Sequence, residues 1–86
     1  MNILKAMEKT LELAMAHGLD CQDSDLPMLD YPHLVDMHAQ CVKDDPSFDD
    51  GKANRYLGWM QSAVHAQSRG AITLDMLREL NMECQP

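Results

Sequence analysis

Aromatic and basic side chains are scarce in this chain of 86 residues: it has one Trp, two Tyr and one Phe, and seven Lys and Arg against fourteen Asp and Glu. The net charge is −7, and no cluster of Lys and Arg forms the basic stripe that binds nucleic-acid phosphates or anionic membranes. We therefore expect neither direct nucleic-acid binding nor membrane binding. A negative surface favours solubility, or a protein partner with a basic surface.

The chain also lacks the cysteine pattern of a disulfide framework. Cys21, Cys41 and Cys84 are odd in number, widely separated and without a CxxC pair, which favours a reducing compartment. No apolar run approaches the length that crosses a bilayer, and the first residues carry charges too regularly for a signal peptide. The sequence thus predicts a cytoplasmic protein.

Length and composition predict one small domain spanning residues 1–86. Hydrophobic residues make up 45% of the chain, and the eight Met must fill much of the interior because aromatic residues are few. A domain of this size is often marginally stable alone, so a homodimer is left open.

Apolar residues at helical spacing predict an all-α fold, a compact four-helix domain with an Asp-rich loop between the first and second helices. The first helix runs from about Asn2 to His17, and the second starts near Pro32 and ends near Lys43. The third begins after Ser47 or Asp49 and ends before Gly70, whereas the fourth begins after Thr73 and leaves residues 82–86 as a frayed tail.

The third helix is predicted to be the centre of the fold, because its apolar residues line one face at 53, 56, 57, 60, 63 and 64. Gly58 within it suggests a close helix contact. Leu74, Leu77 and Leu80 are expected to be buried from the fourth helix, and Leu4, Met7, Leu11, Ala14 and Met15 from the first. The strongest core predictions are Leu11, Leu57, Met60, Val64 and Leu77.

Nine Asp lie between Leu19 and Gly51, with Lys43 as the one base among them. An EF-hand is excluded, because counting from Asp45 places Asp50 and Tyr56 where Gly and Glu are needed. Turns and helix caps account for many Asp. The functional alternative is an acidic docking face, or a mimic of DNA phosphates that inhibits a nucleic-acid enzyme, formed by Asp44, Asp45, Asp49 and Asp50.

No set of residues indicates a reaction. His38 and Cys41 are three residues apart on one helix, but a structural zinc site needs four ligands and no second pair has suitable spacing. No Gly-rich phosphate loop occurs, and nothing marks an oxyanion hole. We expect no cofactor, no metal and no enzymatic activity; a small metal-dependent enzyme is the least favoured alternative.

Trp59 lies off the apolar face of its helix, beside Arg55 on a neighbouring stripe. Trp with Arg is the composition of a binding hot spot. The competing interpretation, which we favour slightly, is that Trp59 packs against the loop or the first helix.

The C-terminal half resembles small accessory proteins of tailed phages and prophages. Those proteins carry a G-K-x-x-R-x-L-G-x-x-Q helix followed by an I-T-x-x-x-[LM]-[RK] helix, patterns that residues 51–61 and 72–78 match. The resemblance brings no catalytic residues; it implies an accessory protein that binds and modulates a host protein in the host cytoplasm.

Overall fold

The computed structural model describes residues 2–22, 24–44 and 50–85. Its α-helices are α1 (Ile3–Ala16), α2 (Tyr31–Asp44), α3 (Asp50–Gln67) and α4 (Leu74–Glu83). Two short 3-10 turns, η1 (Leu19–Cys21) and η2 (Pro27–Leu29), lie in the connection between α1 and α2. No strand occurs in the described ranges, so the prediction of a compact all-α four-helix domain is confirmed.

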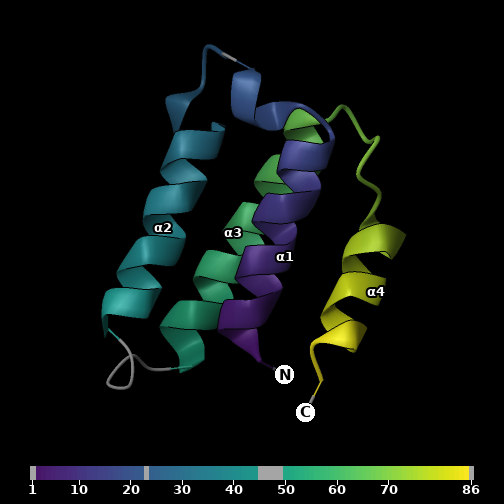
Figure 1. The fold of residues 1–86 in the computed structure, drawn as a ribbon. Helices are drawn as coiled ribbons and strands as arrows, with labels where there is room; N and C mark the ends of the chain where they lie inside the picture. Colours follow the sequence, from purple (N-terminus) through teal and green to yellow (C-terminus); the bar gives the residue numbers. More distant parts are fainter. Residues whose placement is uncertain (1, 23, 45–49, 86) are drawn as a thin grey trace.

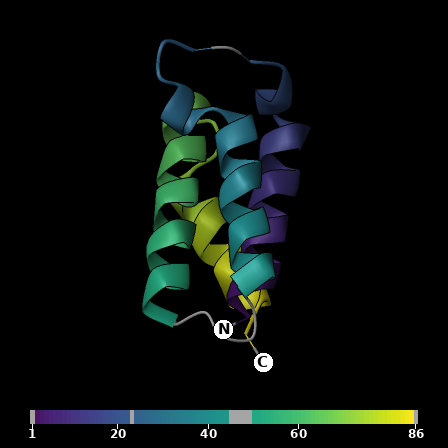
Figure 2. The same ribbon diagram turned by 90° about the vertical axis from the view of Figure 1, so that its left-hand side faces the viewer.

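The helices run up, down, up and down (Figure 1). α1 contacts each of the other three helices, with α2 on one side and α4 on the other. Figure 2 shows α2 and α3 next to each other on the side away from α4. The two chain ends lie at the same end of the bundle, where the Asn2 N–H donates to the Cys84 carbonyl at 2.8 Å.

The core is aliphatic, but Met contributes less to it than the composition predicts, because Met7, Met37 and Met60 are buried whereas Met15, Met28 and Met82 are exposed. All five of the strongest core predictions are buried: Leu11, Leu57, Met60, Val64 and Leu77. Two weaker expectations were wrong, because Met15 is 53% and Leu74 is 61% exposed. Leu74 is the first residue of α4 and lies at an open groove beside Gly58 and Ser62 of α3, so most of it remains exposed to solvent.

Local signals fix most helix ends. The Asn2 side chain accepts from the Lys5 N–H at 3.1 Å, and the Thr73 hydroxyl accepts from the Met76 N–H at 3.1 Å, as N-caps do. Gly18 follows α1 with φ +76°. After α3 both Arg69 (φ +54°) and Gly70 (φ +84°) adopt left-handed backbone, one residue more than the predicted glycine stop.

The expected frayed tail from residue 82 is shorter than predicted. α4 continues to Glu83, and Cys84 is only 2% exposed. The bond from Asn2 to the Cys84 carbonyl holds this segment against the start of α1. α4 thus continues beyond Leu80, the last Leu of the apolar pattern. The buried thiol of Cys84, which packs as a small hydrophobic group, follows its end.

Gly58 does not mark a close helix contact, contrary to expectation. A Cβ built at this position meets no other atom within 4 Å. Its place on the exposed side of α3, at the groove that also exposes Leu74, explains the difference.

Candidate protein-binding site

An apolar groove of about 300 Å³ lies between α2 and α3. Its walls come from the η2 turn, from one face of α2 and from the α3 face next to the core. The residues that line it are Met28, His33, Met37, Gln40, Tyr56 and Trp59. Met28 is 58% and Trp59 is 45% exposed, so the groove presents large apolar side chains to solvent.

The Trp59 side chain is held in place at this groove. Its Nε1–H donates to the Met28 carbonyl at 3.2 Å, a bond that links α3 to a turn 31 residues earlier. The indole N–H thus has a hydrogen-bond partner while the residue as a whole remains nearly half exposed. Trp59 therefore contacts the loop, as the favoured interpretation expected, and is also partly exposed to solvent.

A second hydrogen bond crosses the groove, one helical turn of α3 before Trp59. The Tyr56 hydroxyl donates to Oε1 of Gln40 at 3.3 Å, which joins α3 to α2. Lys52 Nζ lies 5.4 Å from the centroid of the Tyr56 ring, within the range of a cation–π contact. The aromatic wall thus has two fixed side chains.

The connection that supplies Met28 is itself tied to the end of α3. Oδ1 of Asp30 accepts from the Ser24 hydroxyl at 2.6 Å and from Nε2 of Gln67 at 2.8 Å. Gln67 Nε2 also lies 3.1 Å from the Ser24 hydroxyl oxygen. One carboxylate of the Asp-rich loop therefore serves a structural role, in agreement with the expectation that Asp stabilises turns.

Two of the four acidic candidates, Asp44 and Asp50, lie at one end of the same pair of helices. Asp44 is the last residue of α2 and Asp50 the first of α3, while Asp45 and Asp49 lie outside the described residues, as does the cap expected at Ser47 or Asp49. Asp50 is six residues before Tyr56, which corresponds to about 9 Å along a helix. The two predicted interfaces thus belong to neighbouring parts of one helix pair.

Arg55 is exposed on α3, one turn before Trp59. The spacing of four residues places the two side chains on one side of the helix, as predicted. Arg55 contributes a cation next to the aromatic wall of the groove.

The metal interpretation of His38 and Cys41 gains no support. In the described part of the chain, no group of three or more His, Cys, Asp and Glu could hold a metal ion. His38 is half-buried with its Nε2 lacking a hydrogen-bond partner there, and Cys41 is fully buried. A buried Cys in a helical core behaves as a small hydrophobe.

The sequence singled out Trp59 and Arg55 as candidates but not the opposite wall of the groove. Met28, His33, Met37 and Gln40 carry no motif, and Met28 lies in a connection without helical period. The available signal was the spacing of His33, Met37 and Gln40, which places them along one face of their helix.

Comparisons of the chain with protein-family models, with curated proteins and with solved structures gave no match. Among the described helices, none combines the length and the apolar character needed to span a membrane. The geometry of the groove is therefore the basis for the functional proposal.

Proposed function

We propose that this chain is a small acidic protein-binding factor that holds its partner in the groove between α2 and α3. The observation that carries the proposal is the state of Trp59, whose ring is exposed while its N–H is bonded to the Met28 carbonyl. Fixing an aromatic ring before binding reduces the entropy that association loses.

The composition of the groove supports a protein partner. Trp, Tyr, Met and Arg are enriched at the centre of protein interfaces; here Trp59, Tyr56 and Met28 line the groove, and Arg55 lies one turn before Trp59 on α3. A partner would insert an apolar side chain between Met28 and Trp59. An apolar groove of this kind favours a protein interface over mimicry of DNA, which needs a surface of carboxylates.

The partner would carry a basic region beside that apolar anchor. The net charge of −7 attracts a basic protein over distances of about 10 Å. Asp44 at the end of α2 and Asp50 at the start of α3 add to this negative electrostatic field. Guided by the resemblance of residues 51–61 and 72–78, we assign the factor to the phage or prophage accessory proteins, with a host protein as its partner.

The proposal is tested by capture from bacterial lysate with three tagged baits: the native chain, Trp59→Ala and Leu74→Ala. Leu74 is the matched control, because it is also a large exposed hydrophobic residue but lies at the groove between α3 and α4. The expected result is a protein retained by the native chain and by Leu74→Ala and reduced at least about tenfold with Trp59→Ala.

Retention of the same proteins by all three baits would contradict the assignment of the α2–α3 groove. Circular dichroism of the three baits is the folding control. Trp59 is exposed, so its removal should leave the helical signal unchanged.

A further inference from the structure

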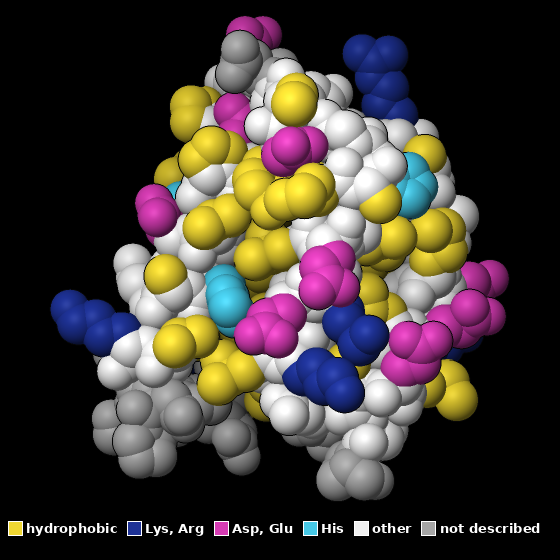
Figure 3. All heavy atoms as spheres, in the orientation of Figure 1, with side chains coloured by type: hydrophobic (Ala, Val, Ile, Leu, Met, Phe, Trp, Pro, Cys, Tyr) yellow, Lys and Arg dark blue, Asp and Glu magenta, His cyan; other side chains and the backbone are white. Residues whose placement is uncertain are grey.

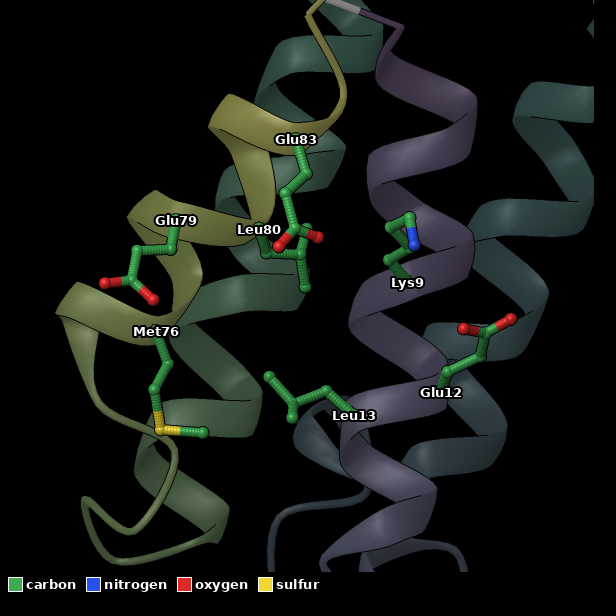
Figure 4. Close-up of a pocket in the computed structure, with 7 residues that line it drawn as sticks. All are labelled: Lys9, Glu12, Leu13, Met76, Glu79, Leu80 and Glu83. Carbon is green, nitrogen blue, oxygen red and sulfur yellow. The ribbon is translucent and has the colours of Figure 1, made fainter.

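A second groove, of about 390 Å³, lies between α1 and α4 on the other side of the bundle. Its floor is apolar, and Figure 4 shows Leu13 and Leu80 pointing toward each other across it, with Met76 beside them. Met76 and Glu83 are seven residues apart, which gives the groove a length of about 10 Å, or two helical turns.

The rims of this groove are acidic. Glu12 comes from α1, and Glu79 and Glu83 come from α4, against the single cation Lys9. In Figure 4 the Glu83 carboxylate points into the groove, whereas Glu12 and Glu79 point outward on opposite rims. Within the described residues, none of these carboxylates makes an ion pair or a hydrogen bond.

The wider surface has the same character. In Figure 3 acidic side chains gather over α1 and α4, with Lys or Arg side chains among them and hydrophobic side chains between. An apolar floor between two acidic rims complements a ligand with an apolar face and cations on both flanks. An amphipathic helix with Leu or Ile on one face and Lys or Arg beside it has this arrangement.

We infer that the α1–α4 groove binds a basic amphipathic helix of a protein partner. Apolar residues at i, i+3 and i+4 would lie over Leu13, Met76 and Leu80. Lys or Arg on either side would reach Glu12 on one rim and Glu79 on the other. Because this groove and the Trp59 groove lie on opposite sides, the chain can hold two protein segments at once.

The test uses the full chain and a labelled synthetic peptide of about 14 residues, with Leu at the i, i+3, i+4, i+7 spacing and Lys elsewhere. The expected result is saturable binding by fluorescence anisotropy that weakens as salt rises from about 0.05 to about 0.5 M. A peptide with Glu in place of every Lys should not bind.

Two double variants separate local charge from net charge. E79Q/E83Q removes two groove carboxylates, and D20N/D36N removes two exposed carboxylates elsewhere, so both change the net charge equally. E79Q/E83Q should weaken binding at least about fivefold and D20N/D36N less than about twofold. Neutralising Glu83 also removes a negative charge from the C-terminal end of a helix, so the fold should persist.

Methyl NMR of the Met residues locates the peptide. The Met76 signal should shift on binding, while Met28 and the Trp59 indole N–H should not. Equal weakening by the two double variants, absence of binding, or shifts at Met28 and Trp59 would overturn the inference. Trp59→Ala should bind the peptide as the native chain does, so this result is independent of the function proposed for the Trp59 groove.

Discussion

Gln61 and Asn81 exchange two amide hydrogen bonds between α3 and α4. Gln61 Nε2 donates to Asn81 Oδ1 at 2.8 Å, and Asn81 Nδ2 donates to Gln61 Oε1 at 3.2 Å. Gln61 Nε2 also donates to the hydroxyl of Thr10, a fully buried residue of α1, at 3.2 Å. This pair therefore ties three helices together at a defined register.

The Gln61–Asn81 pair should be energetically coupled. Gln61→Ala and Asn81→Ala should each lower the free energy of unfolding by about 1 kcal/mol or more, because each leaves the other amide without its partner. The double variant should cost less than the sum, with a coupling of about 0.5–3 kcal/mol. Urea unfolding of the native chain, the two single variants and the double variant measures this coupling. Strictly additive losses of stability would argue against the pair.

Leu57→Ala tests the centre of the core. Leu57 is 3% exposed within the cluster that α3 shares with α1, so its truncation should cost about 2–5 kcal/mol. Leu74→Ala is the matched control: Leu74 is exposed, and its loss should change stability by no more than about 0.5 kcal/mol. A cost below about 1 kcal/mol at Leu57 would place it outside the core.

Gly58→Ala should stabilise the protein. Gly58 is inside α3, where glycine costs up to about 1 kcal/mol relative to alanine, and the added methyl group meets no atom within 4 Å. The expected gain is about 0.5–1 kcal/mol in thermal or urea unfolding. Destabilisation would mean that a close contact exists at this position after all.

Sequence patterns predicted the four helices because their signals are local. Caps such as Asn2 and Thr73 act within one turn, and the stripe that contains Leu57 and Met60 follows from helical spacing. Burial of the stripe follows from the need of any amphipathic helix to cover its apolar face.

What the sequence could not predict depends on residues far apart in the chain. The Met28 carbonyl reaches Trp59 only because the η2 turn folds over α3, and Gln61 finds Thr10 across 51 positions. Leu74 fits the apolar pattern of its helix yet remains exposed, because the pattern does not show which helix lies opposite.

The negative charge of Asp44, Asp45, Asp49 and Asp50 should control the rate of association with the captured partner. Changing Asp44, Asp45, Asp49 and Asp50 to Asn removes four negative charges that together steer a basic surface. Association should become slower and less dependent on salt, with little change in dissociation. Stopped-flow measurements from about 0.05 to about 0.5 M salt test this, and an unchanged salt dependence would exclude the acidic docking role.

The dissociation rate of the captured partner from Trp59 variants tests the central proposal most directly. If Trp59 anchors the partner in the α2–α3 groove, Trp59→Ala should raise the dissociation rate about 30-fold or more, equivalent to a loss of about 2 kcal/mol. Trp59→Phe, which keeps a ring but loses the bond to Met28, should have an intermediate rate. Dissociation from Trp59→Ala within about twofold of the native rate would contradict the proposal, since an anchor acts chiefly on dissociation.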